Sequence, residues 1–496
     1  MSKSREKSPL LSVAIDKGAA ASLQIQIFDQ VRDAILAGRL APGTRLPASR
    51  TLAGELAVSR NTVLAAFERL YAEGYTEGRV GSGTRVSQIL PEELLSARKN
   101  RHRSGDTPSN PGKLSLLSSQ LDSYRHRGRE RGRRAFRPGL PDLDSFPFAV
   151  WSRLVGRFWR NPRKDLVFAG DLSGYRPLRD VVAAYLGAVR GLHCTGENIV
   201  ITSGAQQALD LVARTIIDPG DRVWVENPGY TGLRNTLLAA GAELVHVPVD
   251  AGGMAVATAR KLAPDAVLAA VTPSHQYPLG ITMSLSRRLE LLDWARERGA
   301  WILEDDYDSD FRYSGKPLSA LQGLDQSGRV IYVGTFSKIL FSTLRLGYVV
   351  LPDHLLDPFL SVRAALDDHP ALALQPALAE FIEAGHFAAH LRRLRKLYGE
   401  RQEIMIDALV RHGDGLFTAE PHEAGMHVIA GMTDQVMMTD QAASARADQA
   451  DLVAPALSGY YADPTVDRRG LVLGYAGLTE REINRDVQKL VRRFTG

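Results

Sequence analysis

The pattern of apolar and polar positions divides the chain into three regions. In the first region, apolar residues recur at helical spacing, and Val63, Ala66, Phe67 and Leu70 form one buried face. The helical stretches expected here are 22–37, with Ser22 as a cap, then 49–57, and a third stretch that begins at Ser59. Two strand-like pieces, 75–79 and 84–87, follow and are joined by a glycine turn. This order predicts a winged helix-turn-helix, although a three-helix protein-interaction module shares the same apolar pattern.

From residue 138 to the end, short apolar runs alternate with helical stretches. The strand candidates are 199–202, 222–226, 243–248, 266–271, 301–304, 330–333 and 346–351. The alternation predicts an α/β fold with a mostly parallel sheet, whose functional residues follow the carboxyl ends of the strands.

Between these regions, the chain is polar and basic, which predicts a flexible linker with little packing. The expected division is therefore a DNA-binding domain over 20–90, a linker over 91–137 and an effector domain over 138–496. The net charge of +5 is unevenly distributed, with +4 in residues 1–90, +7 in 91–137 and −6 in the remainder. A basic front suggests an anionic partner such as nucleic acid, and a solvated arginine-rich linker is the alternative.

The composition supports a globular chain in a reducing compartment. Apolar residues make up 44% and charged residues 24%, which is typical of folded proteins. Cys194 is the single cysteine, so an intrachain disulfide is impossible, and we expect a cytoplasmic protein. We find no apolar stretch of about 18 residues, and therefore expect no membrane span.

The first region carries residues suited to DNA. The first turn of the third helix offers Arg60, Asn61 and Thr62 to base edges in a major groove, and Ser59 precedes them. Phosphates can be contacted from the preceding helix and from the wing. The residues expected in those contacts are Arg45, Ser49, Arg50, Arg79, Gly81 and Gly83.

Two runs in this region resemble the DNA-binding domain of GntR-type bacterial repressors. They are PGTRLPASRTLA at 42–53 and VSRNTV at 58–63. The resemblance implies that double-stranded operator DNA is the partner. It also implies that Arg50, Arg60, Asn61 and Thr62 contact the operator.

In the large region, chemically useful residues follow successive strand candidates. A Ser-Gly turn before a helix, with Ala205 and Gln206 at the helix start, forms a cradle for a phosphate. The other residues at strand ends are Tyr230, Asp305, Tyr307, Thr335, Ser337, Lys338 and Arg345. Taken singly, each has a structural alternative: Lys338 as a surface lysine, Asp305 as a helix cap, Arg345 as half of an ion pair.

Their co-occurrence is explained most simply by pyridoxal 5′-phosphate (PLP). A lysine such as Lys338 forms a Schiff base with an aldehyde, and a buried carboxylate such as Asp305 keeps a pyridine nitrogen protonated. Tyr230 is expected to stack on the ring, and Tyr307 to contact its phenolic oxygen. The phosphate is expected to lie on the backbone N–H groups of Ala205 and Gln206 and on Thr335, Ser337 and Arg345.

Four runs in this region resemble the fold-type I, class I/II aminotransferase domain as it occurs in MocR-type regulators, a subgroup of the GntR repressors. They are NPGY at 227–230, TPSHQYPLG at 272–280, EDDYDSDFRY at 304–313 and FSKILFSTLRLGY at 336–348. The resemblance implies a winged helix joined to a PLP-dependent transferase fold, with helices on both faces of the sheet and a smaller C-terminal subdomain. It also implies that His275 and Gln276 line the pocket, and that the chain is a homodimer.

The sequence departs from the aminotransferase pattern at one position. Many members bind the substrate carboxylate with an arginine in a C-terminal strand, and here Val472 occupies that position. Arg468 and Arg469 lie just upstream, but at a different spacing. We therefore expect a transcriptional regulator that senses PLP, an amine or an amino acid through Lys338. The alternative is an active aminotransferase with an accessory DNA-binding domain.

Overall fold

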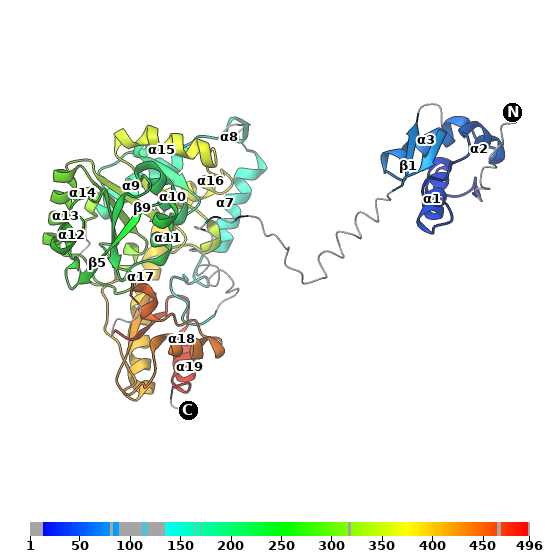
Figure 1. The fold of residues 1–496 in the computed structure, drawn as a ribbon. Coiled ribbons are helices and arrows are strands. Elements are labelled where there is room, and N and C mark those ends of the chain that lie inside the picture. The colour runs from blue at the N-terminus through cyan, green and yellow to red at the C-terminus, as the bar shows by residue number, and fades with distance from the viewer. Residues whose placement is uncertain are drawn as a thin grey trace. The chain divides into compact units, whose positions relative to one another are not determined.

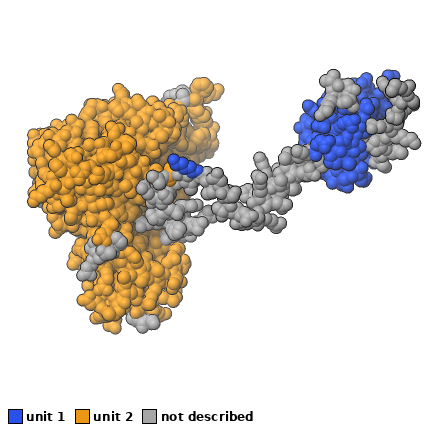
Figure 2. All heavy atoms as spheres, in the orientation of Figure 1, with its two compact units in different colours: residues 1–114 blue, residues 115–496 orange. Residues whose placement is uncertain are grey.

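The chain forms two compact units, residues 1–114 and 115–496 (Figures 1 and 2). They are seen in a computed structural model, and each is described by itself. The structure describes residues 13–79, 83–88, 113, 115, 117, 134–162, 164–168, 170–315, 319–463 and 468–494, with Arg79 and Asp165 described by their backbone only.

The first unit is a winged helix-turn-helix, as the sequence predicts. Its elements are α1 (Leu23–Leu36), α2 (Ser49–Glu55), α3 (Arg60–Ala72), β1 (Thr76–Arg79) and β2 (Gly83–Val86). The two strands pair antiparallel, from Thr76 opposite Val86 to Arg79 opposite Gly83. The predicted glycine turn between them, including Gly81, lies outside the described residues except for Gly83.

The predicted apolar face of α3 is confirmed, since all four of its residues are buried against α1 and α2. The Ser59 hydroxyl caps α3 by accepting a hydrogen bond from the Thr62 N–H at 3.1 Å. Ser22 occupies the N-cap position of α1, but its side chain makes no capping hydrogen bond. Helix α3 therefore begins at a fixed residue, with Arg60 and Asn61 in its first turn.

The second unit is built on an eight-stranded mixed sheet in the order β3-β10-β9-β8-β7-β4-β5-β6. Its strands are β3 (Ile199–Thr202), β4 (Arg222–Asn227), β5 (Glu243–Asp250), β6 (Gly253–Met254), β7 (Leu268–Val271), β8 (Trp301–Asp306), β9 (Val330–Thr335) and β10 (Gly347–Val350). The pairs among β9, β8, β7, β4 and β5 are parallel, and β10 and β6 run antiparallel to their neighbours. All seven strand candidates of the sequence are therefore strands of one mostly parallel sheet.

Helices cover both faces of this sheet, because side chains alternate along the strands: Val200 packs on one face, Ile199 and Ile201 on the other. One face is covered by α10 (Ala205–Ile216), α11 (Thr231–Ala239) and α15 (Asp353–Leu366). The other is covered by α9 (Arg176–Arg190), α12 (Val256–Leu262), α13 (Leu285–Arg298), α14 (Leu321–Leu324) and α16 (Gln375–Glu383).

A smaller C-terminal part follows the long helix α17 (His386–Gly413), and is drawn in orange and red in Figure 1. It holds a three-stranded antiparallel sheet of β11 (Phe417–Thr418), β12 (His427–Met432) and β13 (Gly470–Gly474) with α18 (Asp440–Gln449) and α19 (Glu480–Val491). The remaining elements are α7 (Phe148–Arg160), α8 (Lys164–Phe168), η2 (Gly196–Asn198), η3 (Ser309–Phe311), η4 (Ser342–Leu344) and η5 (Leu457–Tyr460).

The segment 134–137, which the sequence assigned to the linker, belongs to this second unit. The Phe136 side chain is fully buried, and the Phe136 carbonyl accepts a hydrogen bond from the Gly474 N–H at 2.8 Å. Arg134 forms ion pairs with Asp448 and Asp451. The folded unit therefore includes residues before 138, and its first extended segment lies beside β13.

Candidate functional site

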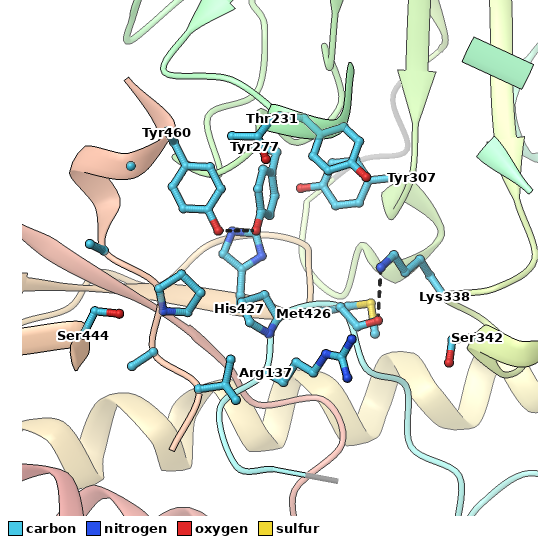
Figure 3. Close-up of a pocket in the computed structure, with 18 of the residues that line it drawn as sticks. Arg137, Thr231, Tyr277, Tyr307, Lys338, Ser342, Met426, His427, Ser444 and Tyr460 are labelled. Atoms are coloured by element: carbon cyan, nitrogen blue, oxygen red, sulfur yellow. Dashed lines mark hydrogen bonds between the residues drawn. The ribbon is translucent and has the colours of Figure 1, made fainter. Parts of the chain in front are cut away.

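A pocket of about 740 Å³ opens where the main sheet meets the C-terminal part (Figure 3). Nine of the eleven predicted cofactor residues line it: Ala205, Gln206, Tyr230, Asp305, Tyr307, Thr335, Ser337, Lys338 and Arg345. They come from the carboxyl ends of β3, β4, β8 and β9 and from the loops that follow, as expected for an open α/β sheet. The parallel topology thus gathers residues that are far apart in the sequence.

Lys338 presents its amine inside the pocket. Its Nζ donates a hydrogen bond to the Gly139 carbonyl at 3.2 Å, the contact drawn as a dashed line beside Lys338 in Figure 3. Burial lowers the pKa of the Lys338 amine, and the charge of Arg137 lowers it further against the opposing effect of Asp308 and Asp305. A lowered pKa increases the neutral fraction of the amine, which is the form that attacks a carbonyl carbon.

Asp305 is a buried carboxyl group with an unused hydrogen-bonding position. Its Oδ1 has no hydrogen-bond partner among the described residues, and the residue is 5% exposed. Burial raises the pKa of Asp305 to about 7, and the neighbouring carboxylates of Asp306 and Asp308 add to the rise. A buried acceptor without a hydrogen-bond partner lowers the free energy of unfolding. The position therefore suits a ligand that brings a positively charged N–H group.

The turn between β3 and α10 forms a cradle closed by an arginine. Gly204 is the N-cap residue of α10 and has a φ of 98°, which favours glycine. A Cβ atom at Gly204 would lie 3.3 Å from Cζ of Arg345, so that guanidinium lies directly against the turn.

A hydroxyl group completes this cradle. The Ser337 Oγ lines the same pocket and is buried without a hydrogen-bond partner among the described residues. A helix N-terminus, a guanidinium and a hydroxyl together match the donors that a phosphate group requires.

The two remaining predicted residues, His275 and Gln276, are buried but do not occur among the described residues that line the pocket. The His275 Nδ1 lies 3.0 Å from the Tyr307 hydroxyl and 2.8 Å from Oδ2 of Asp308. Gln276 Nε2 donates to the carbonyl groups of Pro228 and Tyr277, both at 2.8 Å. These side chains therefore lie behind the pocket and hold its wall in place.

Several pocket residues were not among the sequence candidates. From the segment 272–280 it is Tyr277 that lines the pocket, and its hydroxyl lies 3.1 Å from that of Tyr460 (Figure 3). Arg137 and His427 line it as well. One feature of the sequence could have pointed to Arg137. It directly precedes Pro138-Gly139, where the alternating pattern of the large region begins.

In the first unit, the candidate DNA residues lie around the start of α2 and α3. Arg45, Arg50, Ser59, Arg60 and Asn61 are exposed, and the Thr62 hydroxyl lies 2.8 Å from that of Ser59. The Arg60 Nε donates to the Ser49 hydroxyl at 3.5 Å, which brings the two helix starts together.

The wing begins close to this surface. A Cβ at Gly83 would lie 3.0 Å from the Arg45 Nε, so Arg45 borders the wing. The Arg79 side chain and Gly81 lie outside the described residues.

Comparison with known proteins agrees with both units. The family described as "Bacterial regulatory proteins, gntR family" matches residues 23–86, and "Aminotransferase class I and II" matches residues 161–490. The probable rhizopine catabolism regulatory protein MocR of Rhizobium meliloti is 40% identical over 491 residues, covering 97% of this chain and 96% of that protein. The chain belongs to the MocR-type regulators of the GntR family.

Other similar proteins span the same two parts. The pyridoxine biosynthesis transcriptional regulator PdxR of Corynebacterium glutamicum is 32% identical to this MocR-type chain and covers 95% of it, as the chain covers 95% of PdxR. The structure of LysN, an α-aminoadipate aminotransferase from Thermus thermophilus complexed with N-(5′-phosphopyridoxyl)-L-leucine, is 26% identical with a TM-score of 0.70. The match covers 77% of this chain and 97% of LysN. This MocR-type chain is therefore a transcriptional regulator with an aminotransferase-like domain.

Val472 does not occur among the described residues that line the pocket of this MocR-type regulator. Val472 is fully buried in β13, in an apolar cluster with Leu279, Leu457 and Tyr460. Arg469 does not replace a pocket arginine, because its guanidinium donates to the Val436 carbonyl and pairs with Asp434. Arg468 is exposed and does not occur among the described residues that line the pocket.

None of the described helices of this MocR-type chain combines the length and hydropathy that crossing a bilayer requires.

Proposed function

We propose that this regulator binds PLP in the pocket at Lys338, and that its occupation by the cofactor, or by an amine or amino acid effector, changes operator binding by the first unit. The observation that carries the proposal is the combination, in one pocket, of a lysine with a lowered pKa, a buried carboxyl oxygen without a described partner, and a phosphate cradle. PLP, when bound, supplies an aldehyde that condenses with amines and a ring that withdraws electrons.

Each side chain has a role in this proposal. Lys338 attaches the cofactor. Asp305 accepts a hydrogen bond from the pyridine nitrogen and so keeps that nitrogen protonated. Tyr230 packs against the ring, and the Tyr307 hydroxyl, held by His275, donates to the phenolic oxygen. The donors for the phosphate are the N–H groups of Ala205 and Gln206 and the side chains of Thr335, Ser337 and Arg345.

Operator recognition is assigned to the exposed surface around the start of α3. Arg60, Asn61 and Thr62 read base edges, while Arg45, Ser49 and Arg50 contact phosphates. A homodimer is part of the proposal, because two winged helices then read two half-sites of one operator. At micromolar concentration, sedimentation of the full chain is expected to give twice the monomer mass of 54.2 kDa.

The first test locates the cofactor. Purified full-length chain is mixed with PLP and reduced with borohydride, and the modified peptide is identified by mass spectrometry. We expect the label at Lys338, and no label at that peptide in Lys338→Ala. Lys396→Ala is the matched control, because Lys396 is an exposed residue of α17 whose amine pairs with Glu400. An unlabelled wild-type chain would contradict the proposal.

The second test measures the response of DNA binding. The same proteins are titrated against the promoter region upstream of the chain's own gene, with and without PLP and a panel of amines. We expect the wild type and Lys396→Ala to change affinity with the ligand, and Lys338→Ala to bind DNA without that change. Steady amino-group exchange with a 2-oxo acid, with operator binding indifferent to every ligand, would favour an aminotransferase instead.

A further inference from the structure

We propose that Asp367 is a positioning residue of the phosphate cradle, and that it acts through the side chain of Gln207. The inference rests on the proposed function, because it takes the turn at Gly204 as the site of the cofactor's phosphate. It assigns a role to two side chains that do not occur among the described residues lining the pocket.

The turn that forms the cradle is held by the residues on either side of its glycine. Gly204 has a φ of 98° and no side chain, so its own conformational freedom is large. The Thr202 hydroxyl donates to the Gly204 carbonyl at 3.2 Å, and the Ser203 N–H donates to Oε1 of Gln207 at 2.6 Å. The second of these hydrogen bonds ties the turn to a side chain in the first turn of α10.

The two adjacent glutamines at the start of α10 have different contacts. Gln206 lines the pocket, whereas the Nε2 of Gln207 donates to Oδ2 of Asp367, the C-cap residue of α15. The Gln207 amide therefore uses both of its ends, the oxygen on the turn and the nitrogen on Asp367. An amide that is bound at both ends keeps one orientation, so Asp367 fixes the direction from which Gln207 meets the turn.

Asp367 is itself held by a buried arginine. Arg363 lies one helical turn earlier in α15, and its side chain is fully buried. The Nη2 of Arg363 lies 3.5 Å from the same Oδ2 of Asp367, and its Nη1 donates to the Ile201 carbonyl at 2.5 Å. Burial lowers the pKa of Arg363, and the charge of Asp367 opposes that shift. The ion pair thus joins the end of α15 to β3, the strand that leads into the turn.

Charge and positioning predict opposite effects for Asp367. The negative charge of its side chain can only repel a phosphate dianion, so electrostatics alone predicts that removing it strengthens phosphate binding. Positioning predicts the reverse, because the Gln207 amide loses its second hydrogen bond and the turn loses a fixed support. The sign of the change therefore separates the two explanations.

The test compares PLP with pyridoxal, which has the same ring and aldehyde but no phosphate. Each ligand is titrated into the full-length chain, and its dissociation constant is obtained from the visible absorption of the complex. The measured quantity is the ratio of the two constants, which reports how much the phosphate contributes to binding. Every variant meets the same two ligands, so differences between the ligands in solution cancel when the ratios are compared.

Two variants remove the support and two keep it. Asp367→Ala and Gln207→Met should each lower the preference for PLP by about tenfold, near the lower end of what a hydrogen bond to a charged group contributes. Asp367→Asn should keep most of the preference, because an amide oxygen still accepts from Gln207. Asp368→Asn is the matched control and should keep the wild-type ratio, because Asp368 is exposed and asparagine tolerates its φ of 60°.

Circular dichroism shows first whether Asp367→Ala folds, because this variant leaves Arg363 without its carboxylate. If it does not fold, Gln207→Met decides the question, since it keeps the ion pair. A wild-type ratio in Gln207→Met, or a stronger preference for PLP in Asp367→Ala, would overturn the inference. Equal weakening of both ligands would overturn it too, because the two residues would then support the whole unit and not the phosphate.

Two results for the wild type separate this inference from the proposed function. A chain that binds PLP and pyridoxal equally well would overturn the inference, because the turn would then hold no phosphate, while the attachment at Lys338 would stand. A chain that acquires no visible absorption with either ligand would overturn the proposed function itself, and with it the present inference.

Discussion

The two units present the same kinds of side chain, arginine and serine, but on different surfaces: one on an open helix start and the other in a pocket. In the first unit, Arg50 and Arg60 are exposed, and their charges act in water. In the second, Arg345 is exposed as well, but it lines a pocket together with the buried Ser337, beside a helix N-terminus and close to groups whose pKa values are shifted by burial. An open surface suits a long polyanion that is bound by many weak contacts. A pocket suits one small ligand whose polar groups all find hydrogen-bond partners.

Salt is expected to separate the two units most strongly. Raising the salt concentration from about 50 to about 200 mM should weaken operator binding by roughly a hundredfold, because exposed cations release counterions from DNA when they bind. PLP binding by the same protein should change much less, because several of its proposed contacts, including Lys338 and Asp305, are buried and screened little. Fluorescence anisotropy on labelled operator measures the first affinity, and an absorption titration with PLP measures the second. Equal salt dependence of the two affinities would contradict this difference between the units.

A single substitution in α3 is expected to affect one unit only. Arg60→Ala should weaken operator binding by about ten- to a hundredfold, since a base contact by arginine is worth roughly 1–3 kcal/mol. PLP binding should be unchanged.

Arg69→Ala is the matched control for this change. Arg69 lies in the last turn of the same helix and pairs with Glu73. Its loss should leave operator affinity within about twofold, as for most exposed ion pairs. Similar losses in both variants would contradict a contact that is specific to the first turn of α3.

The smallest expected effect concerns the stability of the cofactor-free second unit. Because the pKa of Asp305 is raised from 3.8 to about 7, the folded state holds a proton there that the unfolded state releases. This group's contribution to the free energy of unfolding therefore falls as the pH rises from about 4 to about 7. Asp305→Asn removes that loss, and should be more stable than the wild type by roughly 1–3 kcal/mol at about pH 8, but little changed at about pH 4.

Thermal unfolding without PLP at the two pH values measures this effect. Asp407→Asn, which changes an exposed residue of α17, should show no difference between them. If Asp305→Asn is instead less stable than the wild type at the higher pH, the folded protein must stabilise the charged form of the Asp305 carboxylate.

The sequence predicted what depends on local pattern. The apolar period of α3 and the short apolar runs of the main sheet placed those elements, and the strand ends then located Lys338, Asp305 and Arg345. Topology explains this success, since parallel strands bring their carboxyl ends to one edge of the sheet.

The sequence failed where long-range contacts decide the structure. The segment 134–137 is too short to show a periodic pattern, and its place in the fold depends on hydrogen bonds with Gly474 and Val453, more than 300 residues away. In the loop after β7, no periodicity indicates which side chain faces inwards. His275 and Gln276 were chosen, whereas Tyr277 lines the pocket.

The hydrogen bond from Lys338 to the Gly139 carbonyl also links the lysine nitrogen to the backbone of the segment 134–139. A Cβ at Gly139 would lie 2.4 Å from the lysine nitrogen, so the backbone there touches the reactive atom. The same backbone runs through Phe136 to Arg134, which forms ion pairs with Asp448 and Asp451. A nitrogen that acquires a carbon substituent has fewer hydrogens to donate, so a bond formed at Lys338 would weaken this link to the segment 134–139.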